Sequence, residues 1–135
     1  MTVVLFSWGK SIEGGTAEAL TFALDQATER GAEMRWAVTA ELEQEAVALA
    51  AHHGVRHVDV IETPAHDVDA RVAVFAGYCR ASSPDLILFN QSVEGRVIAA
   101  RVAGRLGLPV LANVVALSNA GGSIKAEASA YGWDA

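Results

Sequence analysis

The stretch SPDLILFNQSVEGRVIAARVAGRLGLP, residues 83–109, decides the fold. Its run DLILF at residues 85–89 predicts a strand that is buried on both faces. A short polar loop follows, and Ser92 then predicts the cap of a helix that ends at Gly107. Apolar residues recur along that helix at helical spacing, in one stripe of Val93, Val97, Ala100 and Ala103 and a second of Ala99, Val102 and Leu106. A strand followed by a helix is the repeating unit of an α/β fold.

The same unit recurs along the rest of the chain. Apolar runs predict further strands at residues 3–6, 34–39, 57–61 and 109–115, and a weak alternation predicts an edge strand at 123–129. Three more helices are predicted by the sets Ala17, Leu20, Leu24 and Ala27 (after an N-cap at Thr16), Leu42, Ala46, Leu49 and Ala50, and Val68, Val72, Phe75, Ala76 and Cys79. Their predicted ends are Gly31, Gly54 and the segment Ser82-Ser83-Pro84. We therefore expect one domain over residues 1–135, a three-layer α/β sandwich with a mostly parallel, doubly wound sheet of Rossmann-like or adenine-nucleotide-hydrolase-like type.

Composition narrows the class of protein. The chain has 135 residues, of which 52% are hydrophobic and 19% charged, so it can form a packed core. Its formal net charge of -6 argues against nucleic acid or anionic lipid as a partner. The single cysteine, Cys79, fits a reducing compartment, and the sequence has neither a signal peptide nor an apolar stretch long enough to span a bilayer. We expect a cytoplasmic domain.

A binding site is expected where the strand order reverses. In open parallel sheets the ligand crevice lies at the carboxyl ends of the strands on either side of that point. If the first strand is central and the fourth is its neighbour, the loops at residues 7–15 and 90–96 face the crevice. The candidate cofactor-binding residues are Ser7, Gly9, Asn90, Gln91, Ser92, Gly95 and Arg96. These small and polar residues can offer backbone N–H groups to an anion at a helix start, or they can simply turn the chain and cap the helix.

Other chemistry finds little support in the sequence. Neither loop contains GxxxxGK[ST] or GxGxxG, which argues against a P-loop kinase or a dinucleotide dehydrogenase. The four histidines, His52, His53, His57 and His66, lack metal-site spacing. Cys79 falls on an apolar helix stripe and is expected in the core, and Asp67 and Asp69 are expected to favour a helix start. We expect neither a metal site nor catalysis by this chain alone.

The decisive stretch also resembles the electron transfer flavoprotein family, in particular the amino-terminal domain of its alpha subunit. The matching residues are Pro84-Asp85 before the strand, Ser92 with Gly95-Arg96 in the loop, Arg101-Val102-Ala103 with Leu106 on the helix, and the following strand, which ends near Asn113. The ending AYGWD at residues 130–134 is similar to the tyrosine–glycine segment that leads out of that domain. Two positions depart from the pattern, because Ala100 stands where a proline is often found and Asn113 where an aspartate is usual.

The resemblance implies an electron carrier rather than an enzyme. In that family FAD is held mainly by a separate carboxy-terminal domain of alpha, with help from a beta-type subunit that often holds AMP. The flavin carries electrons from dehydrogenases to an acceptor such as a membrane quinone reductase. The expected partners are therefore a beta-type subunit, in a heterodimer, and a separate FAD-domain chain. The family's FAD domain has no counterpart in this sequence. We therefore expect a free-standing domain of a split flavoprotein, a truncated alpha subunit, or a diverged member that has become a nucleotide-binding or scaffolding module.

Two other functions remain open at this point. One is a stand-alone adenine-nucleotide-binding module of universal-stress-protein type, although Gly95 is the only glycine in the loop that would hold phosphates. The other is a degenerate domain that serves as a dimerisation scaffold. A mean hydropathy of +0.27 favours a partner that covers apolar surface. Trp8 and Trp133 could anchor such an interface or cap the core.

Overall fold

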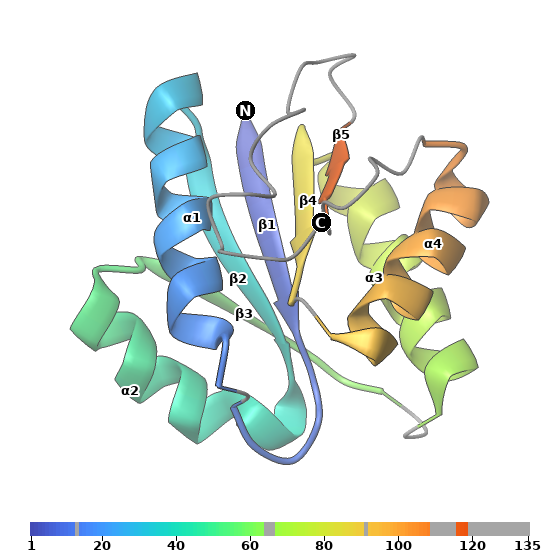
Figure 1. Ribbon diagram of the computed structural model, residues 1–135, viewed down its shortest axis with the longest axis horizontal. Coiled ribbons are helices and arrows are strands. Elements are labelled where there is room, and N and C mark those ends of the chain that lie inside the picture. The colour runs from blue at the N-terminus through green and yellow to red at the C-terminus, as the bar shows by residue number, and fades with distance from the viewer. Residues whose placement is uncertain (13, 64–66, 91, 109–115, 119–135) are drawn as a thin grey trace.

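The protein forms a sheet between two layers of helices (Figure 1). The computed structural model describes residues 1–12, 14–63, 67–90, 92–108 and 116–118. In chain order the elements are β1 (Thr2–Ser7), α1 (Thr16–Arg30), β2 (Glu33–Thr39), a short 3-10 helix (Ala40–Leu42), α2 (Glu43–His53), β3 (His57–Ile61), α3 (Val68–Ser82), β4 (Leu86–Phe89), α4 (Val93–Leu106) and β5 (Ala116–Ser118). The expected α/β three-layer fold is confirmed.

The strand order is β3-β2-β1-β4-β5. β1 pairs in parallel with both β2 and β4, and β2 pairs in parallel with β3. The order therefore reverses between β1 and β4, as the sequence predicts. β5 runs antiparallel to β4 and lies just after the strand predicted at residues 109–115. That predicted strand and the one at 123–129 fall outside the described residues.

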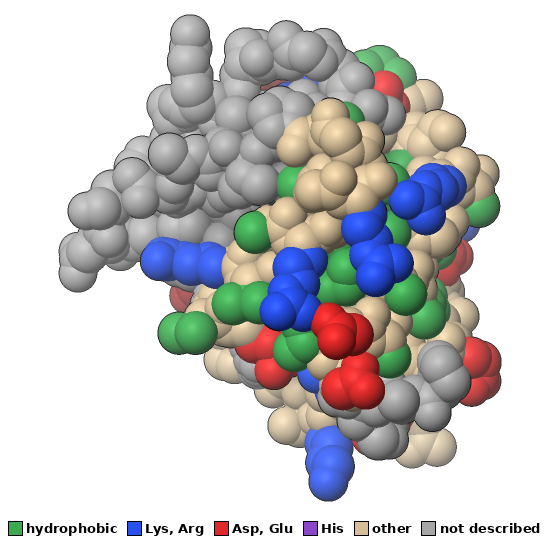
Figure 2. All heavy atoms as spheres, turned by 90° about the vertical axis from the view of Figure 1, so that its right-hand side faces the viewer, with side chains coloured by type: hydrophobic (Ala, Val, Ile, Leu, Met, Phe, Trp, Pro, Cys, Tyr) green, Lys and Arg blue, Asp and Glu red, His purple; other side chains and the backbone are tan. Residues whose placement is uncertain are grey.

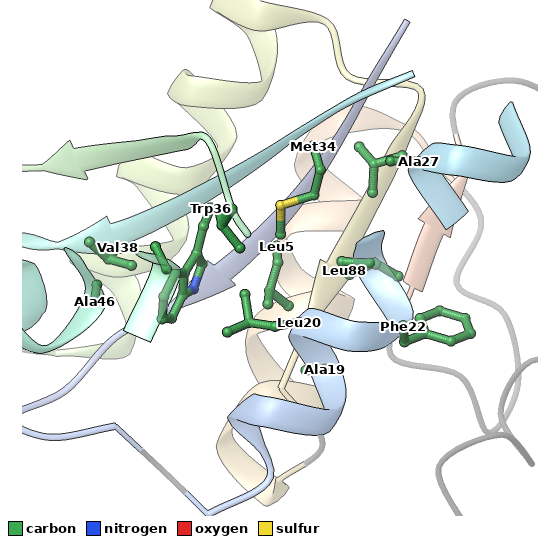
Figure 3. Packing of buried hydrophobic residues seen from close by; sticks show 14 of the residues in the cluster. Leu5, Ala19, Leu20, Phe22, Ala27, Met34, Trp36, Val38, Ala46 and Leu88 are labelled. Atoms are coloured by element: carbon green, nitrogen blue, oxygen red, sulfur yellow. The ribbon is translucent and has the colours of Figure 1, made fainter. Parts of the chain in front are cut away.

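One face of the sheet is covered by α1 and α2. Trp36, which is fully buried, lies at the centre of this core (Figure 3). Leu5 and Leu88 approach from the neighbouring strands, and Leu20 of α1 packs above them. The Trp36 indole N–H donates to the Ser7 hydroxyl oxygen over 2.9 Å, so the one polar atom of this large side chain is satisfied.

The other face is covered by α3 and α4, and its core is aromatic. Phe6 stacks on Phe75 with ring centroids 4.4 Å apart and on Phe89 with centroids 5.4 Å apart. Trp8 is only 6% exposed and packs against both Phe75 and Phe89. Trp8 therefore caps this core, while Trp133 lies outside the described residues.

Most of the predicted helix ends are confirmed. The Ser92 hydroxyl caps α4, and the helices α1, α2 and α4 end at left-handed Gly31, Gly54 and Gly107. Asp67 caps α3, which ends in a left-handed Ser83 before the proline. None of the helices in the described ranges is long and apolar enough to cross a membrane.

One local prediction is wrong, and one question that the sequence left open is decided by the structure. Thr16 is the first residue of α1 rather than its cap, which is Gly15, and the Thr16 hydroxyl accepts a hydrogen bond from the Asn90 side-chain amide. On α4 the stripe that contains Val93, Val97 and Ala100 faces outward, and the buried side consists of Gly95, Ile98, Ala99, Val102 and Ala103. Both apolar stripes have helical spacing, so periodicity could not say which of them packs on the sheet.

Candidate functional site

The carboxyl ends of β1 and β4 meet at one edge of the sheet, where α1 and α4 both begin (Figure 1). The side-chain amide of Asn90 donates to the Thr16 hydroxyl over 3.2 Å. This bond joins the residue after β4 to the first residue of α1. The two loops predicted to face a crevice are therefore neighbours in space.

Asn90 carries the most unusual polar atom at this edge. The residue is 6% exposed, and its side-chain carbonyl oxygen is buried without a hydrogen-bond donor among the described residues. An unpaired buried acceptor costs about 1–3 kcal/mol. A hydroxyl or amino group of a ligand would relieve that cost.

Ser7 and Gly9, the candidates after β1, have structural roles here. Ser7 is 2% exposed, and its hydroxyl accepts the hydrogen bond from Trp36 described above. Gly9 has a φ of +102°, where an added side chain would be strained, so glycine is needed for the turn out of β1.

The start of α4 is closed by its own residues. The Ser92 hydroxyl accepts from the Gly95 amide over 2.9 Å, and the Ser92 carbonyl accepts from the Arg96 amide over 3.0 Å. A methyl group added to Gly95 would lie 2.1 Å from the backbone carbonyl oxygen of Asn90. Gly95 is therefore required for the close approach of α4 to the end of β4. The Arg96 side chain is exposed, and Gln91 lies outside the described residues.

Glu94 joins three segments at this edge, although the sequence analysis did not single it out. Its carboxylate accepts a hydrogen bond from the Trp8 indole N–H and another, over 2.9 Å, from the Arg71 guanidinium of α3. The signal in the sequence was an acid in the first turn of a helix, which is also a common helix-stabilising feature. Nothing in the sequence pairs it with Trp8, which lies 86 residues away.

The family model described as the electron transfer flavoprotein domain matches residues 2–135. The chain belongs to the electron transfer flavoprotein domain family. A search of curated proteins gave no match. The solved structures include a protein from the universal stress protein family from Burkholderia pseudomallei, at a TM-score of 0.51 and 17% identity over 81% of this chain and 92% of that chain. A universal stress protein in complex with cAMP gives a TM-score of 0.46 and 18% identity over 77% and 90%. The first of these likenesses shows a shared fold.

Family membership raises the question of whether this edge of the electron transfer flavoprotein domain fits FAD. A pyrophosphate binds a helix start through free backbone N–H groups and a positive end. At α4 the Gly95 amide is already bonded to Ser92, and Glu94 places a carboxylate in the same turn. The start of α4, as described, does not fit the pyrophosphate of a dinucleotide. The Asn90 oxygen fits an uncharged donor instead.

Titratable groups elsewhere in this electron transfer flavoprotein domain are perturbed by burial. Burial raises the pKa of the Cys79 thiol to about 12, which agrees with its predicted place in the core. Burial also raises the pKa of Tyr78, and the hydrogen bond that its hydroxyl donates to Asp59 raises it further. In the part of the chain that the structure describes, no three His, Cys, Asp or Glu side chains come together as metal ligands.

Proposed function

We propose that this chain is an alpha-type electron transfer flavoprotein domain that assembles with a beta-type subunit and a flavin domain. The single observation that carries the proposal is the family match over residues 2–135. In such an assembly FAD carries electrons from dehydrogenases to an acceptor. The buried single cysteine supports a reducing compartment such as the cytoplasm.

In this proposal the chain holds the partner subunit in place rather than binding most of the flavin. Glu94 at the start of α4 argues that FAD is held mainly by other residues than those described at this edge. The rigid sheet would instead fix the partner subunit, and through it the distance from the flavin to the electron donor. A domain with this role has no covalent step to perform, which agrees with electron carriage rather than catalysis.

Co-expression with a beta-type subunit and a flavin domain from the same organism tests this function. We expect the chains to elute together from a size-exclusion column and to carry bound FAD, identified by its absorbance and by mass spectrometry after denaturation. A dehydrogenase and its substrate should then bleach the flavin absorbance. If the chain elutes alone and the other two chains retain FAD and full electron transfer without it, the proposal is wrong.

A second function is favoured by the unpaired oxygen of Asn90. We propose as an alternative that an adenine nucleotide, AMP or ATP, binds at this edge, with a hydroxyl or amino group on the Asn90 side-chain oxygen. Its phosphates would lie toward the start of α1 and the exposed Arg96 side chain rather than at the capped start of α4. Gly14 and Gly15 support this, because a Cβ atom added at either would meet no atom of the described residues within 4 Å, which leaves room beside the start of α1.

Calorimetric titration with adenosine, AMP and ATP distinguishes the two functions. If the alternative function is right, at least one of these ligands binds. Asn90→Ala then weakens the binding of every ligand that binds, and Arg96→Ala weakens the binding of the phosphorylated ligands only. The control is Thr39→Val, which removes the Thr39 hydroxyl, the other buried side-chain oxygen without a hydrogen-bond partner among the described residues. If none of the three ligands gives a heat of binding, the alternative function is wrong.

A further inference from the structure

The helix α4 is apolar on two opposite sides. Its inner side packs on the sheet through Ile98 and Val102, which are fully buried. Its outer side carries Val93 and Val97, which are 84% and 41% exposed. Ala100 and Gly104 continue the same outer stripe at helical spacing and are also exposed. A surface helix normally turns a polar side to water, so a helix that is apolar on both sides is normally covered on both.

The charge of this layer has the opposite sign to that of the chain. The helices α3 and α4 together carry five arginines and two acids, a net charge of +3, whereas the whole chain has a net charge of -6. The opposite layer, formed by α1, the short helix Ala40–Leu42 and α2, has a net charge of -5 with histidine counted as neutral. Figure 2 shows Lys and Arg side chains gathered among hydrophobic ones on the face formed by α3 and α4.

The two acids of the α3–α4 layer are both paired inside it. Asp69 lies 2.5 Å from the Arg101 guanidinium, and Glu94 lies 2.9 Å from that of Arg71. The layer has three further arginines, Arg80, Arg96 and Arg105, and no further acid, which gives its net charge of +3. On α4, Arg96 lies on one side of the valine stripe and Arg105 on the other, by helical spacing.

We propose that the α4 outer face, defined as Val93, Val97, Ala100 and Gly104 with Arg96 and Arg105 on its flanks, docks a partner protein. The matching surface of that partner has an apolar centre with acidic side chains around it. Protein interfaces have a hydrophobic core within a polar rim and are enriched in arginine, and the α4 outer face shares both features. The inference deepens the proposed function, on which it rests, by assigning the surface through which the beta-type subunit is held.

Charge favours an acidic partner protein over a second copy of this chain and over a nucleic acid. A symmetric pair of copies would place the same arginines against one another, which costs binding energy. A nucleic acid is disfavoured by the net charge of the chain and by the valines in the centre of the face, where aromatic side chains would be needed to stack on bases. An acidic protein surface with an apolar centre complements both the positive net charge of the α3–α4 layer and the exposed valines.

The test compares one substitution on the two layers. Val97→Glu places a carboxylate at the centre of the α4 outer face, whereas Val47→Glu makes the same change on α2, where Val47 is 53% exposed. Glutamate has a better helix propensity than valine, so both variants should fold, as circular dichroism will verify. Each is titrated against a purified beta-type subunit from the same organism. We expect Val97→Glu to weaken binding by at least about tenfold and Val47→Glu by less than about twofold.

A third variant isolates the electrostatic part. Arg105→Gln should weaken binding less than Val97→Glu and should reduce the loss of affinity caused by added salt, since it removes one screened charge pair. If the wild type binds the subunit and Val97→Glu binds equally well, the α4 outer face is not the docking site and the proposed function stands. If the wild type does not bind the subunit, both proposals are wrong. A Val97-dependent homodimer, or binding of a nucleic acid in place of the subunit, would also overturn the inference.

Discussion

The two helical layers of this domain solve the same packing problem with different side chains. The α1–α2 layer covers its face of the sheet around Trp36, with aliphatic neighbours such as Leu20. The α3–α4 layer covers the other face with an aromatic stack centred on Phe6 and Phe75. Inside the molecule the two layers are therefore equivalent, because each buries a continuous core against the sheet.

Outside the molecule the two layers differ in charge and in exposed apolar surface. The α1–α2 layer is acidic and exposes one large apolar side chain, Val47. The α3–α4 layer is basic and exposes Val93 and Val97 on one helix stripe. Folding explains the inner sides of both layers, but it does not explain the outer side of α4. This difference between the outer sides of the two layers is the observation on which the proposed docking surface on α4 rests.

The largest predicted effect tests whether the two cores are equivalent. Phe75→Ala removes the ring that stacks on Phe6, and Leu20→Ala removes a fully buried side chain from the opposite core. We expect each change to lower the free energy of unfolding by about 3–5 kcal/mol, from lost burial and the cavity left behind. Urea denaturation followed by circular dichroism measures both. A loss below about 1 kcal/mol for either variant would show that its layer is not a packed core.

The next effect concerns two glycines on α4. Gly95→Ala brings a methyl group to 2.1 Å from the backbone carbonyl oxygen of Asn90, so the backbone must shift. We expect a loss of about 1–3 kcal/mol in unfolding free energy, as for other overpacked sites. Gly104→Ala on the same helix is the matched control, because its added methyl would meet no atom within 4 Å. That variant should be more stable than the wild type by about 0.5–1 kcal/mol. Equal effects at the two positions would contradict the close approach described for Gly95.

The α4 helix also shows how far the sequence predicts the molecule and where it stops. The strand order around β1 and β4, the cap at Ser92 and the helix ends follow from local patterns and chain connectivity, and the structure confirms them. The inner side of α4 could not be predicted, because Val97 and Val102 belong to stripes of similar hydrophobicity. Only the position of the helix against the sheet decides between the two.

The candidate site illustrates the same limit. The sequence placed two polar loops near each other at one edge of the sheet, where the structure also has them, and left open whether they bind a ligand or turn the chain. Ser7 is instead bonded to Trp36, which lies 29 residues away, and Thr16 is bonded to Asn90, which lies 74 residues away. Long-range side-chain pairs of this kind leave no periodic pattern in a single sequence. The geometry therefore gives the side chains of Ser7 and Thr16 a structural role that the sequence alone could not show.

A smaller effect tests the structural role of the Ser7 hydroxyl. Ser7→Ala leaves the buried indole N–H of Trp36 without its acceptor, and we expect a loss of about 1–2 kcal/mol in unfolding free energy. The exposed Ser11→Ala is the control and should change stability by less than about 0.5 kcal/mol. Thermal and urea denaturation measure both variants. If Ser7→Ala were as stable as the wild type, the hydrogen bond to Trp36 would contribute nothing and Ser7 would be available to a ligand.

The smallest expected effect is at Cys79, in the aromatic core of the α3–α4 layer. Burial raises the pKa of its thiol to about 12, so at pH 8 the reactive thiolate is scarce and the sulfur is inaccessible. We expect almost no alkylation by iodoacetamide in the native protein and rapid alkylation in denaturant, both followed by mass spectrometry. Since an unfolded thiol ionises near a pKa of about 8.5, its contribution to stability is fully present below that pH and is lost as the pH rises toward the folded value. Rapid labelling of the native protein would show instead that α3 separates from the sheet in solution, and the aromatic layer would then be the weaker of the two.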